Sequence, residues 1–221
     1  MAAAVMTLFE IRMVSPGKRD ERAGGAGCVS VMPHRTPALP GAVLGSRVHG
    51  GGAGQDARYA RLQPAHVDGI LYAVDVDGVV TAWRSENGKR LWRSKLETAI
   101  GSGVGVASGL GFVGTLDGRV IAFDLANGQQ KWEARASSEV LATPHSNGEV
   151  VITQAIDGRV FAYSFEDGRQ LWTYDHPVPV LSLRSNASPL ILGDVALVAF
   201  DNGQMLSFDC NTGQLRWSAR V

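Results

Sequence analysis

Four tryptophans recur at nearly constant spacing along this chain, and the recurrence limits the possible folds more than any other feature. Each tryptophan follows a glycine by four residues, and that glycine follows another by ten. Successive tryptophans lie 40, 40 and 45 residues apart. A period of about 40 residues that contains several short strands is typical of β-propeller blades. The repeated positions are the first glycines Gly78, Gly118, Gly158 and Gly203, the second glycines Gly88, Gly128, Gly168 and Gly213, and the tryptophans Trp92, Trp132, Trp172 and Trp217.

One unit shows how this period divides into strands and turns. In the unit that ends at Trp132, short apolar runs bounded by turn residues predict four strands. Asp117-Gly118 predicts a hairpin turn between the second and the third, because glycine tolerates positive φ. The sequence therefore predicts an all-β fold built from four-stranded antiparallel blades. The strands expected in this unit cover residues 103–108, 112–115, 119–123 and 130–133.

The third strand of each unit carries apolar residues at consecutive positions, as in the run 120–123. Such a strand is buried on both faces, as expected for a blade packed between two neighbours. A small residue also recurs in this strand and leaves room for a large neighbour, for which the tryptophan is the obvious candidate. A buried tryptophan removes about 150–250 Å² from water, so we predict a structural role for all four. The small residues are Ala82, Ala122, Ala162 and Ser207.

The number of units predicts an incomplete ring. Propellers built from this repeat usually have seven or eight blades, so about four blades form only an arc. The end blades of an arc expose apolar faces and sheet edges, which favours self-association. We expect a non-propeller leader over residues 1–47 and a partial propeller over residues 48–221. Its blades should lie near residues 58–97, 98–137, 138–177 and 178–221.

The leader carries little interpretable pattern. Residues 15–47 are rich in Gly, Pro, Arg and Ser and show no sustained period, which is typical of a disordered segment. Cys28 follows Gly25-Ala26-Gly27 and faintly resembles a bacterial lipid-attachment site. The usual leucine three residues earlier and the preceding apolar run are missing, so we expect no lipid at Cys28.

Charge and residue spacing argue against several classes of function. The chain has 221 residues with 21 basic and 21 acidic side chains, which gives no electrostatic reason to expect nucleic acid as a partner. Its two cysteines and five histidines show no metal-ligand spacing. We therefore expect no catalytic, cofactor-binding or metal-binding residues.

The last interval between tryptophans is five residues longer than the others, and the excess falls within residues 176–189. A loop that only joins two blades does not require the extra residues, so the extra length suggests a function. Leu181 and Leu183 would project together from an extended segment, with Arg184 beside them. Leucines beside an arginine are suited to binding a protein partner. The alternative is that both leucines fill space between blades, and spacing alone does not decide.

Several motifs resemble known families. The pattern from Ala122-Phe123-Asp124 to Gly128 and Trp132 resembles the quinoprotein-like propeller repeat. Four further stretches are more similar to the outer membrane protein assembly factor BamB family, although that family has glycine where Ser185 stands here. These stretches cover residues 58–64, 101–105, 138–144 and 181–189.

The resemblance implies an eight-bladed, non-catalytic scaffold held by a lipid at the periplasmic face of the outer membrane. It implies binding to the periplasmic polypeptide-transport domains of BamA, the barrel-forming subunit, and help to unfolded outer membrane protein precursors. Family contacts to that partner fall on Leu181, Leu183 and Arg184. Two alternatives share the tryptophan repeat: a fragment of a quinone-cofactor dehydrogenase, and a generic propeller-repeat interaction module. The dehydrogenases usually carry an adjacent cysteine pair, which this chain lacks.

Overall fold

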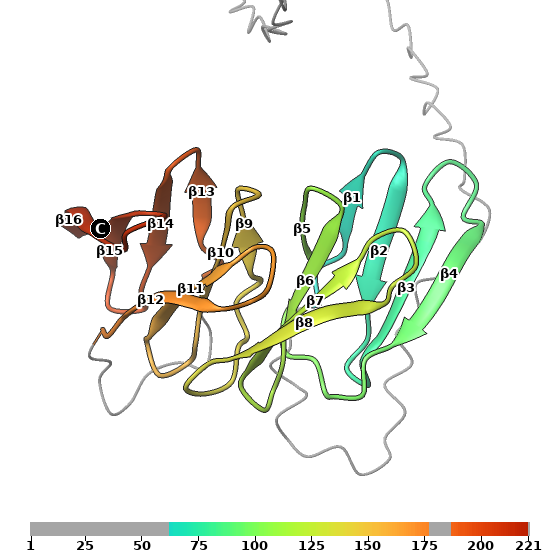
Figure 1. Ribbon diagram of the computed structural model, residues 1–221, viewed down its shortest axis with the longest axis horizontal. Helices are drawn as coiled ribbons and strands as arrows, with labels where there is room; N and C mark the ends of the chain where they lie inside the picture. Colours follow the sequence, from blue (N-terminus) through green and yellow to red (C-terminus); the bar gives the residue numbers. More distant parts are fainter. Residues whose placement is uncertain (1–61, 177–186, 221) are drawn as a thin grey trace, which may run out of the picture. The chain divides into compact units, whose positions relative to one another are not determined.

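The computed structural model describes residues 62–176 and 187–220. The chain divides into two compact units, residues 1–41 and 42–221, and all described residues belong to the second. They form four antiparallel sheets of four strands each, and the described part contains no helix. In every sheet the strands pair in sequence order (Figure 1). The predicted all-β fold of four-stranded blades is confirmed.

Each sheet is numbered by its place in the chain. Sheet 1 contains β1 (Ala65–Val67), β2 (Ile70–Val74), β3 (Val79–Arg84) and β4 (Arg90–Lys95). Sheet 2 contains β5 (Gly105–Ala107), β6 (Leu110–Gly114), β7 (Arg119–Asp124) and β8 (Gln130–Arg135). Sheet 3 contains β9 (His145–Ser146), β10 (Val150–Gln154), β11 (Val160–Ser164) and β12 (Gln170–Tyr174). Sheet 4 contains β13 (Leu190–Leu192), β14 (Val195–Ala199), β15 (Gln204–Asp209) and β16 (Leu215–Arg220).

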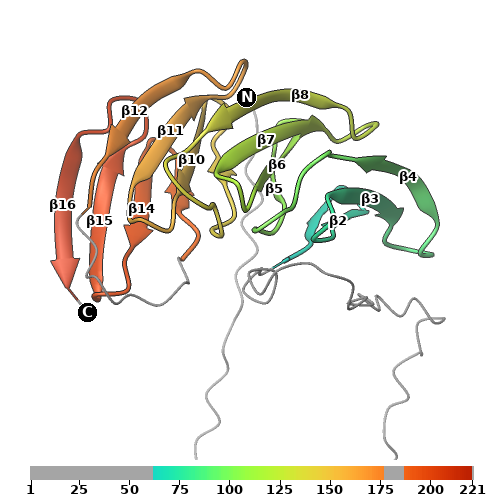
Figure 2. The same cartoon turned by 90° about the horizontal axis from the view of Figure 1, so that it is seen from below.

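The first strands of successive sheets lie side by side. Strand β5 contacts both β1 and β9, and β9 also contacts β13. The fourth strands β4, β8, β12 and β16 lie on the opposite side, away from these inner strands (Figure 2). Each sheet therefore runs from an inner strand to an outer strand, as a propeller blade does.

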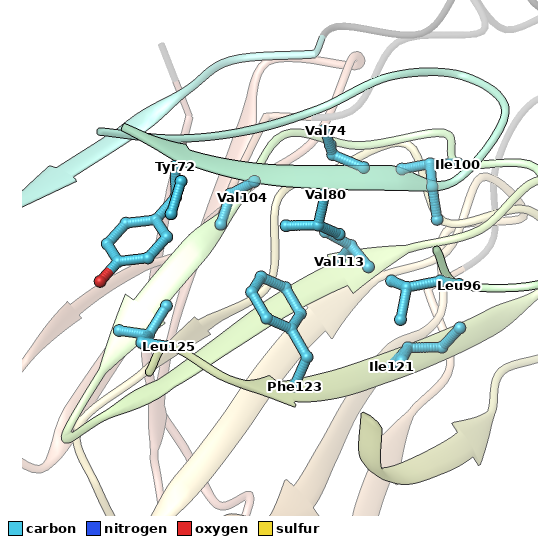
Figure 3. Close-up of a cluster of buried hydrophobic side chains, with 11 residues drawn as sticks. Tyr72, Val74, Val80, Leu96, Ile100, Val104, Val113, Ile121, Phe123 and Leu125 are labelled. Carbon is cyan, nitrogen blue, oxygen red and sulfur yellow. The ribbon is translucent and has the colours of Figure 1, made fainter. Parts of the chain in front are cut away.

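Side chains from neighbouring sheets interlock to form the cores. Between sheets 1 and 2, Val80 packs in one cluster with Ile121 and Phe123 (Figure 3). The alternate residues of β7, Val120 and Ala122, face the other way and pack in a cluster with sheet 3. All four of these β7 residues are at most 1% exposed, which confirms that this strand is buried on both faces.

Within every sheet, the tryptophan lies directly opposite a small residue of the third strand. The register then shifts by one residue immediately after this pair, which is a β-bulge. The small side chain leaves room for the indole, and the bulge increases the local twist of the outer strand. The pairs are Ala82 with Trp92, Ala122 with Trp132, Ala162 with Trp172, and Ser207 with Trp217.

The indole rings also join each sheet to the next one. Trp92 Nε1 donates a hydrogen bond to the carbonyl of Leu125 at 3.0 Å, in the turn that follows β7. Trp132 reaches the Phe165 carbonyl at 2.9 Å, and Trp172 reaches that of Cys210 at 2.7 Å. In each case the acceptor belongs to the following sheet, so one side chain links two blades.

The repeated glycines occupy the turns. The first glycine of each unit lies between the second and third strands, and the second lies between the third and fourth. Gly168 shows why the second position is a glycine: a Cβ there would lie 2.5 Å from Cε3 of Trp132, which belongs to the preceding sheet. Gly213 lies beneath Trp172 in the same way, since a Cβ added there would lie 2.6 Å from Cδ2 of that ring.

Trp217 departs from the predicted burial. Its side chain is 45% exposed, whereas Trp132 is only 7% exposed. Trp132 is covered because sheet 3 packs over it. The described residues include no sheet that packs over Trp217 in the same way.

The contact between indole and turn glycine can be tested with two alanine substitutions. Gly128→Ala would overlap Cζ3 of Trp92 and lie 2.7 Å from Cβ of Ser94. Gly109→Ala is the matched control, because Gly109 also has positive φ (84°) but no atom lies near its added Cβ. Both variants bear the backbone strain of roughly 1–2 kcal/mol. Gly128→Ala should lower the free energy of unfolding by roughly 1–3 kcal/mol more, from overpacking.

Chemical denaturation of both variants measures that difference directly. Equal destabilisation of the two would mean that the Trp92 ring moves aside at little energetic cost and does not constrain the turn.

Candidate binding surface at the connector between sheets 3 and 4

The residues predicted to bind a partner lie outside the described part of the chain. Leu181, Leu183 and Arg184 fall within residues 177–186, between β12 and β13. Cys28 likewise falls in the segment 1–61, before the described residues begin. These assignments stay predictions. What the structure does describe is how each end of the connector is held.

The connector leaves sheet 3 through a buried histidine. His176 is only 8% exposed, and its ring packs on Phe200 of sheet 4 with a centroid distance of 3.9 Å. Its Nε2 lies 3.3 Å from Nδ2 of Asn202. Burial lowers the pKa of this imidazole, and the negative charge of Asp201 opposes that shift without cancelling it. The neutral ring is therefore favoured at this anchor.

The connector rejoins the described chain at a second anchor. The Oγ of Ser188 accepts a hydrogen bond from the backbone N–H of Thr143 at 3.1 Å, just before β9 of sheet 3. A few residues further on, Asn147 Nδ2 donates to the carbonyl of Gly193 at 3.1 Å. Sheet 4 is thus tied back to sheet 3 on the side of the inner strands.

Together these contacts set a fixed base for the connector. Residues 177–186 begin beside His176, which packs against sheet 4, and end beside Ser188, which is bonded to sheet 3. A segment whose two ends are already held loses less conformational entropy when it binds a partner. The base therefore suits a recognition segment mounted on rigid sheets.

Other features of the described residues have no evident chemical role. No group of three His, Cys, Asp or Glu side chains in that part of the chain could hold a metal ion. Burial raises the pKa of the Cys210 thiol to about 11, so it stays protonated and is a poor nucleophile. Helices long and apolar enough to cross a membrane are also absent from residues 62–176 and 187–220.

A groove of about 1180 Å³ lies between sheets 1 and 2. Its walls include Tyr72, Trp92 and Leu125, all of which also belong to the packing between those two sheets. The ion pair between Lys131 Nζ and Asp124 Oδ2, at 3.1 Å, lies at this groove. The groove therefore arises from the packing of neighbouring blades.

Two exposed leucines escaped the sequence analysis. Leu190 and Leu192 in β13 are 52% and 58% exposed, although they belong to an inner strand. Cross-strand pairing places them on the same face of sheet 4 as Leu197 and Val195. The spacing of Leu190 and Leu192 could have predicted that both lie on the same face of the strand, because successive residues of a strand point to opposite faces. What it could not tell was that no sheet among residues 62–176 and 187–220 covers this face.

Comparison with known proteins gives a consistent family. A family model described as outer membrane protein assembly factor BamB matches residues 76–221. The relative of that name from Pseudomonas aeruginosa is 59% identical over 170 residues, covering 77% of this chain and 45% of the relative. The relative from Escherichia coli is 36% identical over 180 residues, covering 77% and 46%. The chain thus spans about half the length of the curated relatives it matches.

Solved structures show the same fold. The crystal structure of BamB from Moraxella catarrhalis aligns with a TM-score of 0.65 and 28% identity, over 72% of this chain and 48% of that one. Quinohemoprotein alcohol dehydrogenase from Comamonas testosteroni aligns with a TM-score of 0.59, over 73% of this chain and 35% of that one. Its identity is only 18%, so this likeness concerns the fold alone.

The histidine anchor predicts a pH dependence of stability. Because folding lowers the pKa of His176, the unfolded chain binds a proton more readily, and its imidazole titrates near pH 6.5. The free energy of unfolding should therefore be largest above about pH 6.5 and fall as the pH drops through that value. Burial lowers the pKa of His145 too, which adds to the same trend.

Denaturation curves at several pH values would measure this effect in the wild type and in His176→Gln and His145→Gln. Each substitution should make the pH profile shallower. A profile in His176→Gln as steep as that of the wild type would show that this anchor does not depend on a neutral ring.

Proposed function

This chain belongs to the outer membrane protein assembly factor BamB family, and from that membership we propose that it serves as a non-catalytic scaffold in outer membrane protein assembly. The observation that carries the proposal is the family match over residues 76–221, joined by relatives that bear the same name. The names of those relatives support a place of action in outer membrane protein assembly, and the periplasmic face of that membrane is our proposal.

The proposed partner is the set of periplasmic polypeptide-transport domains of BamA. The proposed contacts are Leu181, Leu183 and Arg184, two apolar side chains beside an arginine. Arginine is enriched among residues that dominate binding energy, and apolar anchors supply the buried area around it. The anchors at His176 and Ser188 support this assignment, because they hold both ends of the segment that carries the three residues.

A scaffold role is also consistent with how the repeated side chains are used. The indoles of Trp92, Trp132 and Trp172 join one sheet to the next, and the second glycines make room for them. The recurring residues thus serve the framework, while connections between sheets are free to vary and to bind. In this proposal the chain orients BamA and unfolded precursors and performs no reaction.

Capture of the chain by the immobilised periplasmic part of BamA tests the contacts. Arg184→Glu and Leu183→Asp should each weaken binding by about 2 kcal/mol or more, roughly thirtyfold, if they are dominant contacts. The charge-matched control is Arg169→Glu, an exposed arginine in the turn before β12 of sheet 3. It should bind as the wild type does.

Equal binding by Arg184→Glu and the control would remove the connector from the proposal, and failure of the wild type to bind would favour a different partner. A second assay addresses the dehydrogenase alternative: incubation with the quinone and calcium, followed by absorbance spectroscopy. A stoichiometric bound chromophore would contradict the scaffold role.

A further inference from the structure

The groove between sheets 1 and 2 reflects a difference between two neighbouring blade interfaces. Between sheets 2 and 3, Phe165 packs edge-on against Phe112 at a centroid distance of 5.8 Å, and Phe112 is 0% exposed. One blade earlier, Leu125 takes the place of Phe165 as the residue whose carbonyl accepts the indole hydrogen bond. Tyr72 takes the place of Phe112 opposite the small residue of the third strand. Leucine is shorter than phenylalanine and leaves part of the tyrosine uncovered, so both residues line the groove.

Tyr72 places one polar atom at the floor of this groove. Its side chain is only 3% exposed, and its hydroxyl points away from Phe123 and the rest of the hydrophobic cluster (Figure 3). Among the described residues, none forms a hydrogen bond with that hydroxyl. The buried hydroxyl of Tyr163, in contrast, donates to the carbonyl of Arg135 at 2.8 Å. The floor of the groove therefore holds a polar group that the fold itself leaves unpaired.

This hydroxyl is a hydrogen-bond donor at neutral pH. Burial and the negative charge of Asp68 raise the pKa of the Tyr72 phenol, so the group stays protonated. A molecule that fills the groove displaces water from the donor. Because an unpaired buried donor is costly, that molecule must bring an acceptor of its own.

Apolar side chains surround the hydroxyl. The Tyr72 ring lies beside that of Trp92, with a centroid distance of 6.0 Å, and Trp92 is only half-buried. Leu91, the preceding residue of β4, lines the same groove and is 38% exposed. Val106 and Leu110, on the side of sheet 2, are half-buried lining residues as well. An apolar side chain that enters the groove would remove this surface from water, which favours binding.

The rim of the groove carries an excess of negative charge. Its acidic residues are Asp68 in the turn after β1, Asp124 at the end of β7, and Glu166 in the turn after β11. Lys131 also lines the groove, but its Nζ is already paired with Asp124 at 3.1 Å. Asp68 and Glu166 are exposed and form no ion pair within the described part of the chain. The rim is therefore complementary to a basic group.

We propose that this groove binds an extended segment of another polypeptide in which an apolar side chain stands next to a lysine or an arginine. The apolar side chain lies against Trp92, and a backbone carbonyl of the segment accepts the hydrogen of the Tyr72 hydroxyl. The basic side chain pairs with Asp68 or Glu166 at the rim.

The donor at the floor favours an extended segment over a helix. Interior carbonyls of a helix already accept intrahelical hydrogen bonds, whereas those of an isolated extended segment are free to accept from the tyrosine. Neighbouring side chains of an extended segment also point to opposite sides, so the apolar one enters the groove while its basic neighbour reaches the rim. The volume of about 1180 Å³ exceeds the roughly 300–1,000 Å³ of small-molecule pockets, which favours a peptide.

The groove and the connector lie at opposite ends of the sheets. The groove is lined by residues 124–127, in the turn that joins β7 to β8, and by Phe165 in the equivalent turn that leads into β12. The connector leaves from the other end of β12, where His176 packs on Phe200. Both surfaces are therefore accessible to different partners at the same time, and this inference does not rest on the proposed binding to BamA.

Fluorescence anisotropy of the full chain with a labelled synthetic peptide of alternating leucine and arginine tests the proposal. Tyr72→Phe keeps the ring but removes the hydroxyl, and it should weaken binding by roughly three- to tenfold. Leu125→Phe reproduces the packing of the next interface, closes the groove and should abolish measurable binding. Asp68→Asn combined with Glu166→Gln should weaken binding, and that loss should shrink as salt is added because the rim is exposed.

Two matched variants and two matched peptides serve as controls. Tyr163→Phe removes a hydroxyl outside the groove, and Asp77→Asn removes an exposed carboxylate from the turn at the other end of sheet 1. Both should bind the peptide as the wild type does. Peptides with glutamate in place of arginine, or serine in place of leucine, should not bind measurably. Circular dichroism checks that every variant keeps its strands.

Three results would each overturn the proposal: a wild type that does not bind the peptide, equal binding of the glutamate peptide, or unchanged binding by a folded Tyr72→Phe or Leu125→Phe variant. If Leu125→Phe does not fold, Tyr72→Phe and the double variant at the rim still decide the question.

Discussion

Each of the first three sheets reaches the next through one indole ring, and the rest of the described fold depends on that contact. The ring fills the space above a turn glycine and donates its Nε1–H to a backbone carbonyl of the following sheet. A larger residue at the glycine would collide with the ring. Because each contact joins only neighbouring sheets, the cohesion of the fold accumulates from one blade interface to the next.

The same indole explains features within a blade. It needs a small residue opposite it, which is why Ala122 lies across from Trp132. The next residue of the third strand, such as Phe123, points to the face that meets the preceding sheet, because successive residues of a strand alternate between faces. Consecutive residues of one strand thus serve two different interfaces, and a substitution at either affects one neighbour more than the other.

Two kinds of surface remain after the framework is assembled. The connector between sheets 3 and 4 departs from the repeat, and His176 and Ser188 hold its ends on a rigid base. The face of sheet 4 that carries Leu190 and Trp217 has no covering sheet among the described residues. The connector is a surface at which we propose that a different protein binds. The likeness to the dehydrogenase, at 18% identity, concerns the fold alone.

The sequence by itself determined the blade. The spacing of Gly118, Gly128 and Trp132, together with the apolar run between them, was enough to predict strand order, turn positions and burial on both faces of the third strand, because these follow from local geometry and from the period. Only the tertiary structure decided which sheet each indole reaches, why Trp217 is exposed, and that Leu190 lies on an open face. Those properties depend on which surfaces meet across neighbouring sheets. The repeated motif has the same sequence pattern whether or not a neighbouring sheet covers it.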